Sequence, residues 1–381
     1  MIIIPEKMVA GGTALGRIDG KAVFVPFALP GETCEIVITE SKKDYAFARL
    51  VSVLEPSPRR VEPRCPLFGR CGGCTLQMAD DEYQRQLRKS ILENALARAR
   101  VTPEKEVSVV SGDPWGYRSR FQFHKTPDGG IGFSEGGSSA VVEVSDCPVA
   151  SRTCRESIID GTIARAARKS ATGNRFHVFG HQGRLWQEGI DEACEVPVAG
   201  TTIRFNVKGF FQSNIPMLES LIGAITAIPV NGTSAFSGER LLDFYSGVGT
   251  FSATTGKAFA ETVLVEHNRE ALEIARTNLA GSPGKAILCP TSDARWPARP
   301  ESRLAYDCAI VDPPRLGIDR ATLDWILSSK IGDLRSVSCD PVTFARDAAR
   351  LVAGGFSLRE VTLFDFYPQT HHIETLAFFT R

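Results

Sequence analysis

The sequence Leu-Leu-Asp-Phe-Tyr-Ser-Gly-Val-Gly-Thr-Phe occupies residues 241–251, and it decides the fold class of the chain. Its apolar first half predicts a buried strand, and Gly247 and Gly249 predict a tight turn that opens a helix. A second apolar run, 262–265, ends in Glu266, nineteen residues after Gly247. Glycines let a ligand approach the backbone, and an acid accepts hydrogen bonds from ribose hydroxyls. This pattern therefore predicts a nucleotide-binding βαβ unit.

Ser252 narrows the choice of ligand for this βαβ unit. A dinucleotide-binding fingerprint has a third glycine where this chain has Ser252. The substitution argues against a pyrophosphate and leaves a cofactor such as S-adenosylmethionine. An ordinary strand-to-helix turn without a ligand is the alternative.

Strands and helices continue to alternate toward the C-terminus. We expect a helix at 269–279 and strands at 286–288, 306–311, 334–338, 356–364 and 373–379. In an open α/β sheet the carboxyl ends of the strands line the ligand crevice. The side chains expected there are those of Glu266, Asp293, Asp312 and Cys339. Glu374, near the start of the last strand, is either part of this site or an ordinary solvated strand residue.

Cys339 has sequence neighbours that suit a nucleophile. It follows an expected strand, Asp340 has the chemistry of a helix N-cap, and Pro341 suits the first helical position. The positive end of that helix favours the thiolate, which is the nucleophilic form of cysteine. The alternative is a small buried residue at a strand end.

The composition indicates a globular protein of two or three domains. The chain has 381 residues, 43% of them hydrophobic, and no run long and apolar enough to cross a bilayer. Its start lacks the pattern of a signal peptide, so we expect a cytoplasmic protein. The net charge is zero, so any surface for nucleic acid must be local. Ten cysteines in such a protein indicate metal binding or catalysis before disulfides.

Residues 1–57 are predicted to form a small β-barrel. Glycines separate short apolar runs, and Leu29-Pro30-Gly31 is a strong turn signal. Small barrels of this kind often bind oligonucleotides, and a purely structural cap fits the composition equally well. A proline-containing linker follows at 55–58.

Three cysteines after the linker have a spacing that suits a metal site. Cys65, Cys71 and Cys74 lie among glycines whose turns would aim the sulfurs inward. Cys147, in a turn before a proline, is the best candidate for a fourth ligand. Four thiolates fit either zinc or a [4Fe–4S] cluster, and the spacing alone leaves both open.

The middle of the chain is predicted to be α+β and is partly basic. Between Arg59 and Lys125 it has thirteen Lys or Arg and eight Asp or Glu, a local net charge of +5. Helices are expected at 80–100 and 156–169. The segment 117–125 mixes basic and aromatic residues. This mixture fits either phosphate contact with base stacking or a strand with a polar outer face.

Taken together, these motifs resemble the RNA uracil-5-methyltransferase family, specifically its 23S rRNA type with an iron–sulfur cluster, over nearly the whole chain. The glycine-rich opening with Leu29-Pro30-Gly31-Glu32 resembles a TRAM domain. Asp312-Pro313-Pro314-Arg315 resembles the fourth-strand motif of the family, and Ser338-Cys339 its nucleophile motif. The family commonly has Asn after this cysteine. Here Asp340 follows, and its carboxylate would disfavour the thiolate.

The resemblance implies roles for individual residues. Cys65, Cys71, Cys74 and Cys147 look like the ligands of a [4Fe–4S] cluster, which favours the cluster over zinc. Cys339 looks like the nucleophile, and Glu374, in His372-Ile373-Glu374-Thr375, looks like the general base. The positions that look like S-adenosylmethionine-binding ones are Gln212, in Phe210-Phe211-Gln212-Ser213-Asn214, with Tyr245, Gly247, Gly249, Thr250, Glu266, Asp293 and Asp312.

The implied architecture is multidomain. It has a TRAM- or OB-like β-barrel at 1–57, an α+β iron–sulfur and RNA-binding central domain at 58–200, and a Rossmann-like α/β class I methyltransferase domain at 201–381. The implied activity is S-adenosylmethionine-dependent methylation of uracil C5 in 23S rRNA. Cys339 would bond to C6, and Glu374 would remove the C5 proton. A tRNA uracil-5-methyltransferase and a non-catalytic RNA-binding iron–sulfur protein are the alternatives. RNA is the expected partner, with no membrane contact and no obligate protein partner.

Overall fold

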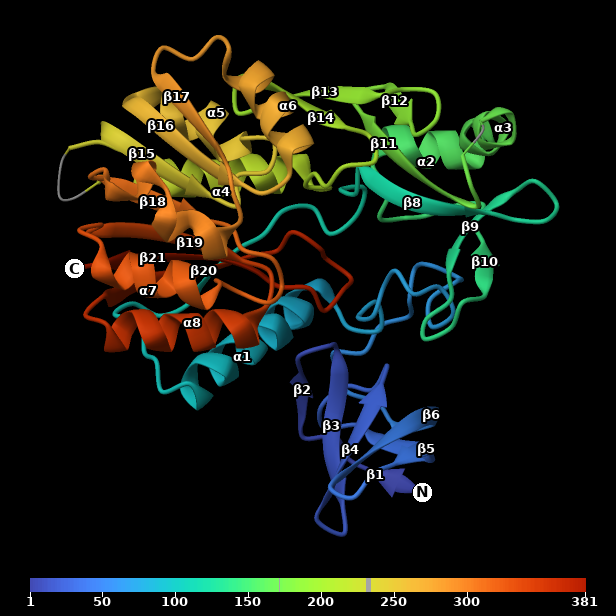
Figure 1. The fold of residues 1–381 in the computed structure, drawn as a ribbon. Helices are drawn as coiled ribbons and strands as arrows, with labels where there is room; N and C mark the ends of the chain where they lie inside the picture. The colour runs from blue at the N-terminus through green and yellow to red at the C-terminus, as the bar shows by residue number, and fades with distance from the viewer. Residues whose placement is uncertain (171, 231–233) are drawn as a thin grey trace.

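A computed structural model describes residues 1–170, 172–230 and 234–381, apart from the side chain of Asp293. Over these residues the strands form four sheets. They are a six-stranded sheet near the N-terminus, a five-stranded sheet, a two-stranded hairpin and an eight-stranded sheet that ends near the C-terminus. Figure 1 shows the N-terminal sheet (blue) set apart from the eight-stranded sheet (yellow to red) and the five-stranded sheet (green).

The N-terminal sheet has the strand order β1-β5-β6-β4-β3-β2. Its strands alternate buried and more exposed residues, because one face packs on a core that includes Val23, Val25 and Ile36. The short strands expected in this part of the sequence are confirmed. Their bounds are β1 Ile2–Ile3, β2 Lys7–Val9, β3 Thr13–Ile18, β4 Lys21–Pro26, β5 Thr33–Ser41 and β6 Tyr45–Glu55.

Helix α1, Asp81–Arg98, confirms the helix expected at 80–100. Its N-cap residue is Asp80, whose carboxylate accepts a hydrogen bond from the Tyr83 N–H at 2.9 Å. Its apolar face, which includes Leu87 and Ile91, is buried, and the helix packs against α8, Pro341–Ala353. The N-terminal part of the polypeptide thereby joins the C-terminal sheet.

The five-stranded sheet has the order β10-β9-β8-β11-β12, and helix α2 packs on β11 and β12. The prediction of a single helix at 156–169 is wrong. The chain forms two short helices there, because Gly161 adopts a left-handed φ of 74° between them. The elements are β8 Arg120–Lys125, β9 Ile131–Ser134, β10 Val141–Glu143, α2 Arg152–Ile159, α3 Thr162–Lys169, β11 Arg175–His181 and β12 Arg184–Gln187.

The aromatic residues of segment 117–125 point into the protein. Phe121 and Phe123 are buried and stack on Phe133, and the buried Tyr117 donates its hydroxyl to the Pro368 carbonyl. The interpretation that RNA bases stack on these rings is therefore wrong. The segment is a strand with an apolar inner face and a polar outer face.

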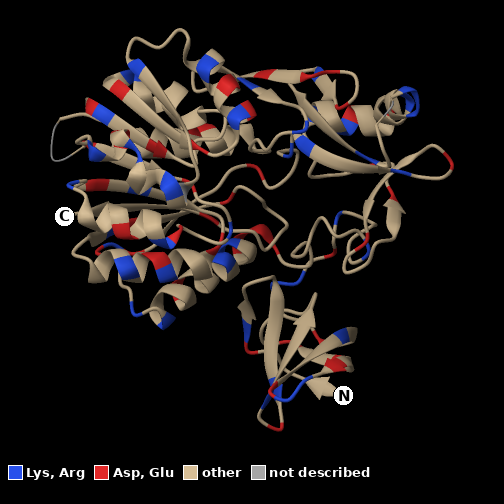
Figure 2. Ribbon diagram, in the orientation of Figure 1, with Lys and Arg blue, Asp and Glu red and all other residues tan. Residues whose placement is uncertain are grey.

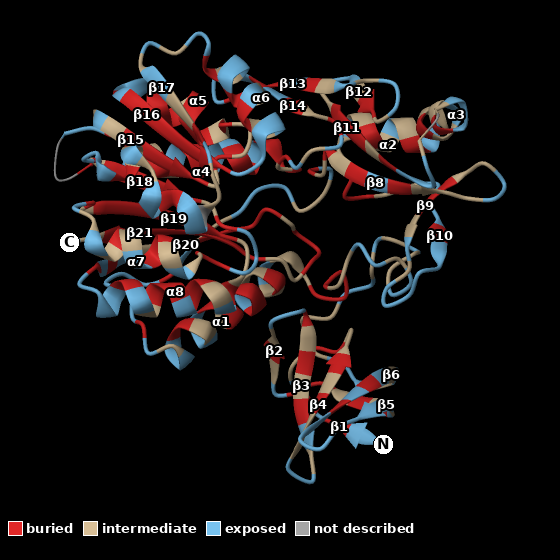
Figure 3. Cartoon of the chain, viewed as in Figure 1, coloured by how far each residue is buried: buried red, intermediate tan, exposed pale blue. Residues whose placement is uncertain are grey.

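The eight-stranded sheet has the order β17-β16-β15-β18-β19-β21-β20-β7. Strands β15 to β19 pair in parallel, so their carboxyl ends lie at one edge of the sheet. Its strands β16, β18, β19 and β21 are buried over almost their whole length (Figure 3). The strands are β7 Ser108–Val110, β15 Gly238–Phe244, β16 Phe259–Glu266, β17 Lys285–Pro290, β18 Cys308–Val311, β19 Asp333–Ser338, β20 Ser357–Phe364 and β21 Glu374–Thr380.

Helices connect the strands of this sheet. The helix expected at 269–279 is confirmed as α6, whose N-cap residue is Asn268. The α-helices are α4 Ile215–Ala227, α5 Thr250–Thr255, α6 Arg269–Leu279, α7 Arg320–Ser328 and α8 Pro341–Ala353. Short 3-10 turns cover η1 Gly256–Ala258, η2 Asp293–Ala298 and η3 Pro300–Arg303, and the hairpin consists of β13 Ala193–Val198 and β14 Thr201–Asn206.

Strand β21 runs antiparallel to both of its neighbours, β19 and β20. Its amino end therefore lies at the same edge as the carboxyl ends of the parallel strands. Strand β7, from the predicted central range 58–200, completes the sheet by pairing with β20. The domain division at 58–200 and 201–381 stays a prediction.

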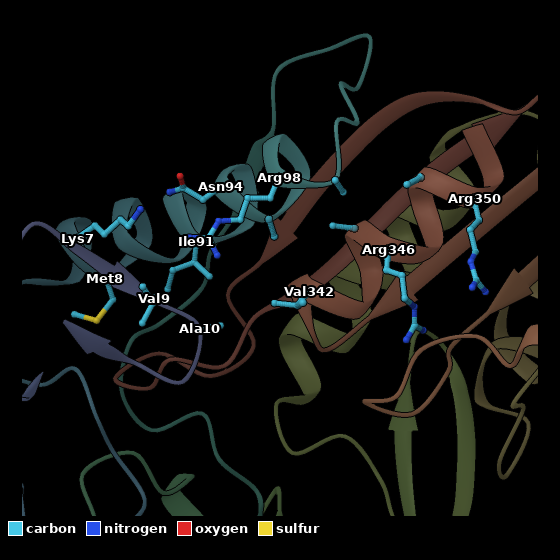
Figure 4. A pocket seen from close by; sticks show the side chains of 14 residues that line it. Lys7, Met8, Val9, Ala10, Ile91, Asn94, Arg98, Val342, Arg346 and Arg350 are labelled. Atoms are coloured by element: carbon cyan, nitrogen blue, oxygen red, sulfur yellow. The ribbon is translucent and has the colours of Figure 1, made fainter. Parts of the chain in front are cut away.

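Charges and cavities complete the description. Lys and Arg are interspersed with Asp and Glu over the elements (Figure 2), and no described helix is long and apolar enough to cross a membrane. A cavity of about 470 Å³ lies between β2, α1 and α8 (Figure 4). Its wall includes Met8, Ile91 and Val342, and none of the predicted site residues lines it.

Candidate active site

Cys339 and Glu374 lie opposite each other at one edge of the sheet. Cys339 follows β19, and Glu374 is the first residue of β21. The two strands pair with Ser338 opposite Thr375, so the next pair in this antiparallel register is Cys339 and Glu374. The Thr375 hydroxyl donates to the Ser338 carbonyl at 3.2 Å and supports the register. Glu374 is only 2% exposed.

The helix after Cys339 begins as expected. The Asp340 carboxylate accepts hydrogen bonds from the N–H groups of Val342 and Thr343 at 3.0 and 2.8 Å, and Pro341 is the first residue of α8. The Asp340 carboxylate is thus engaged with the amides of its own helix. The proposed cap is confirmed.

The thiol of Cys339 is difficult to ionise. Burial is the largest cause, followed by the charges of Glu374 and Asp312, and together they raise the pKa of Cys339 to about 12. Arg315 acts in the opposite direction. The sequence expectation named only the helix end and Asp340. It missed these contributors because they belong to other strands.

Asp312 and Arg315 are charged groups that act on both Cys339 and Glu374. Asp312 follows β18, and its burial raises its pKa to about 7. The pKa of Glu374 is well above the ordinary range, chiefly because Glu374 is buried and also because of the charge of Asp312. The Arg315 guanidinium lowers the pKa of both Cys339 and Glu374. Sequence reasoning quoted Arg315 within a motif but did not propose it as a site residue. Its position after two prolines at a strand end is the signal that was available.

Replacing Asp312 with asparagine is expected to speed alkylation of Cys339 near pH 8, by up to about tenfold. Asp312 is negatively charged above its raised pKa and then opposes the thiolate, whereas asparagine keeps the shape without the charge. Well below that pKa the wild-type carboxyl is neutral, so the two proteins should react alike. Mass spectrometry of the Cys339 peptide after iodoacetamide treatment measures the rate. Equal rates across the whole pH range would contradict this electrostatic assignment.

The glycine turn after β15 has two distinct parts. Gly247 adopts a φ of 53°, and a Cβ there would meet open space, so the backbone is accessible to a ligand. Gly249 adopts a φ of 74° and packs closely, since a Cβ would lie 3.1 Å from Leu264 and Ala275 side-chain atoms. The Glu266 carboxylate accepts a hydrogen bond from the Gly247 N–H at 3.1 Å. These residues fit a nucleoside-containing cofactor such as S-adenosylmethionine.

Asp243 is a candidate site residue that the sequence did not lead us to propose. It is completely buried in β15, and Ser252 donates its N–H and its hydroxyl to one carboxylate oxygen. The other oxygen, Oδ1, has no hydrogen-bond partner among the described residues. Burial, opposed by the Ser252 bonds and aided by Asp312 and Glu266, raises the pKa of Asp243 to about 7. An acid inside an apolar strand was the available signal.

The other predicted cofactor residues are placed as follows. Tyr245 adopts a φ of 60°, and its hydroxyl accepts a hydrogen bond from the Asp319 N–H at 3.2 Å. Gln212 accepts one from the Tyr367 hydroxyl at 3.1 Å. Thr250 is the first residue of α5. Asp293 opens the turn η2, and its side chain lies outside the described part of the chain.

Electrostatic interactions connect the four predicted cysteine ligands in one group. The charges of Cys71 and Cys65 act on Cys74, and those of Cys74 and Cys65 act on Cys147. Burial is the largest cause that raises the pKa of Cys74 to about 11 and that of Cys147 to about 12. Among the described residues, no group of three or more His, Cys, Asp or Glu side chains is arranged to hold a metal ion.

Comparisons with known proteins identify the family. Residues 3–51 match the TRAM domain, and residues 301–381 match the family described as tRNA (Uracil-5-)-methyltransferase. An uncharacterized RNA methyltransferase of Treponema denticola is 42% identical over 100% of this chain and 99% of its own length. The 23S rRNA (uracil(1939)-C(5))-methyltransferase RlmD of Shewanella amazonensis is 31% identical over 97% of this chain and 93% of its own length. The chain belongs to the RNA (uracil-5-)-methyltransferase family.

The fold of this RNA (uracil-5-)-methyltransferase also matches a solved structure. The tRNA (uracil-54, C5)-methyltransferase of Pyrococcus abyssi, solved in complex with S-adenosyl-L-homocysteine, superposes with a TM-score of 0.74 and 25% identity over 100% of both chains. The eight-stranded sheet is therefore a class I methyltransferase fold, and the N-terminal sheet is a TRAM domain. The enzyme uses S-adenosylmethionine and acts on RNA.

Proposed function

We propose that this enzyme methylates C5 of a uridine in 23S rRNA through a transient bond between Cys339 and C6 of the uracil. The observation that carries the proposal is the β19–β21 register, which sets Cys339 opposite Glu374. A thiol and a buried carboxylate on facing strands are the nucleophile and the base that this reaction needs.

Cys339 acts first. Uracil C5 is a poor nucleophile, and addition of the Cys339 thiolate to C6 forms an S–C bond and an enolate with electron density at C5. The Arg315 guanidinium favours this thiolate against the charges of Asp312 and Glu374. The charge of Asp312 acts on both Cys339 and Glu374, so Asp312 is close enough to this pair to help position the target base or the cofactor.

Glu374 acts last. When bound, S-adenosylmethionine supplies the methyl group that C5 takes up, and the Gly247 turn, Glu266 and Gln212 would hold it. Glu374 then removes the C5 proton, the C6–S bond breaks, and Cys339 leaves 5-methyluridine. A carboxylate with a raised pKa is a stronger base than an ordinary one once it is ionised.

The RNA class is the finer part of the proposal. Support for 23S rRNA comes from the relatives named for that substrate, which align over nearly the whole chain, and from the four-cysteine set. A tRNA substrate is the second candidate, because the Pyrococcus abyssi protein of that name matches the whole fold. Incubation with labelled S-adenosylmethionine and separate 23S rRNA and tRNA transcripts tests the choice. Label confined to tRNA would overturn the rRNA assignment.

We further propose that Cys65, Cys71, Cys74 and Cys147 hold a [4Fe–4S] cluster. Their donor set fits, because four thiols of this kind are the usual ligands of such a cluster. The backbone around the sulfurs also fits, since the N–H groups of Gly73 and Val149 act against burial and lower the pKa of Cys71 and Cys147, which favours the thiolate that binds iron. The cluster would hold this segment together, and methyl transfer requires no redox step from it.

Replacing Cys65 with serine is expected to remove most of the iron and to lower RNA affinity or turnover by about tenfold or more. The physical reason is that a cluster with three cysteine ligands no longer fixes the segment between β6 and α1. Iron analysis, RNA binding and turnover of the purified proteins are the measurements. Cys34→Ser, at a buried cysteine of the TRAM sheet, is the control that should keep its iron. If Cys65→Ser lost iron but bound RNA and turned over normally, the structural role would be wrong.

A further inference from the structure

The connection between β20 and β21, residues 365–373, leads directly into Glu374. It is held by side chains that are distant in the sequence. Arg88 of α1 donates to the Asp365 carboxylate and to the Thr370 carbonyl, both at 2.8 Å, and Tyr117 donates to the Pro368 carbonyl at 2.8 Å. The segment that precedes the proposed base is therefore tied to α1 and to Tyr117, just before β8.

Gln369 lies at the centre of these contacts. It is 1% exposed and has a φ of 68°, in the left-handed region that residues with side chains seldom adopt. Its N–H donates to Gln84 Oε1 at 2.9 Å, and its carbonyl accepts from the N–H groups of Thr75 and Leu76 at 2.9 and 3.0 Å. Its side chain accepts from Gln84 Nε2 and donates to Asp81 Oδ1, both at 2.9 Å.

These bonds tie two elements to the connection. Gln84 and Asp81 belong to α1, whereas Thr75 and Leu76 directly follow Cys74. The residues between Gln369 and Glu374 have little space to absorb a displacement. The His371 N–H donates to the Thr75 hydroxyl at 3.0 Å, and a Cβ at Gly12 of the TRAM sheet would approach His371 Cβ to 2.6 Å.

We propose that Gln369 is a positioning residue for the reaction. Its left-handed backbone and its bonds to α1 and to residues 75–76 hold the start of β21, and with it Glu374, against Cys339. The inference rests on the proposed role of Glu374 as the base. Proton removal requires hydrogen-bond reach in the right direction, so a small displacement of Glu374 slows that step far more than it slows thiol addition.

Gln84→Leu and Gln86→Leu form the matched pair that tests this inference. Gln84 is buried and hydrogen-bonded to Gln369, whereas Gln86 lies two residues along the same helix, is exposed, and donates to Glu82. Single-turnover reactions with RNA and labelled S-adenosylmethionine separate formation of the covalent RNA–protein adduct from release of methylated RNA. We expect Gln84→Leu to slow release by about tenfold or more with adduct formation and cofactor affinity unchanged. Gln86→Leu should match the wild type.

Two substitutions at Gln369 test the backbone directly. Glycine accepts the left-handed conformation and keeps the backbone bonds to Gln84, Thr75 and Leu76, so Gln369→Gly should release product within about threefold of the wild-type rate. Valine is β-branched and resists this conformation, so Gln369→Val should accumulate adduct. If the valine variant does not fold, Gln84→Leu and Gln369→Gly still decide the matter.

The outcomes are distinct. Accumulated adduct in Gln84→Leu, with rapid release in Gln369→Gly, supports positioning. Equal slowing of both steps with weakened cofactor binding would mean a merely structural role and would overturn the inference. Unchanged release in Gln84→Leu would also overturn it. A wild-type enzyme that forms methylated RNA without any adduct would instead refute the proposed covalent mechanism.

Discussion

Cys339→Ala is expected to lower methylation of the RNA substrate by at least about 10⁴-fold, because it removes the thiol that is proposed to add to C6. Cys339 is the thiol at the end of β19, and the side chains around it are the carboxyl groups of Glu374 and Asp312 and the Arg315 guanidinium. Without the sulfur, C5 stays a poor nucleophile, and a correctly bound methyl donor is not sufficient.

The measurement is transfer of label from S-adenosylmethionine to RNA, with cofactor affinity measured in parallel. Cys339 is not among the residues proposed to hold the cofactor, so the affinity should stay within about threefold of the wild-type value. Cys339→Ser tests the same step with a similar shape and a weaker nucleophile. An alanine variant that still produced 5-methyluridine at a substantial rate would exclude the covalent mechanism.

Glu374→Gln is expected to lower turnover by about 10²- to 10⁴-fold and to trap the enzyme on its RNA. Glutamine fits the buried site but cannot accept the C5 proton, so the C6–S bond cannot break by elimination. The substitution also removes a charge that raises the pKa of Cys339, so thiol addition should proceed at least as readily as before. The expected product is a covalent protein–RNA complex that already carries the methyl group.

Denaturing electrophoresis with doubly labelled RNA and cofactor detects that complex. Glu360→Gln on the neighbouring strand β20 is the control, because Glu360 pairs with Lys105 and takes no part in the site. It should leave turnover within about twofold of wild type. If Glu374→Gln released methylated RNA at the wild-type rate, another group would have to be the base.

Local signals in the sequence were sufficient for much of the fold. The strand, glycine turn and helix around Gly247 depend on nearest neighbours, as does the cap formed by Asp340 and Pro341, and the structure has both. Helix α6 was expected with its observed bounds for the same reason. Where a local signal was misjudged, as at Gly161, a single left-handed residue divided one expected helix into two.

Burial was harder to infer than secondary structure. The aromatic residues of β8 have a pattern that suits either face of a strand, and only the packing of Phe121 and Phe123 on Phe133 shows which face is inside. Asp243 appeared as one polar residue in an apolar strand. Its complete burial, with one oxygen that has no partner among the described residues, emerges only when the chain is folded.

The resemblance named Cys339 and Glu374 as reaction partners, but the strand pairing that joins them is non-local. Strand β21 inserts antiparallel between β19 and β20, so its first residue meets the end of β19. The pKa of Cys339 follows from that insertion, because charges on separate strands meet in a buried place. Short-range patterns specify elements and caps, whereas strand order, burial and the electrostatics of the thiol depend on contacts between segments far apart in the chain.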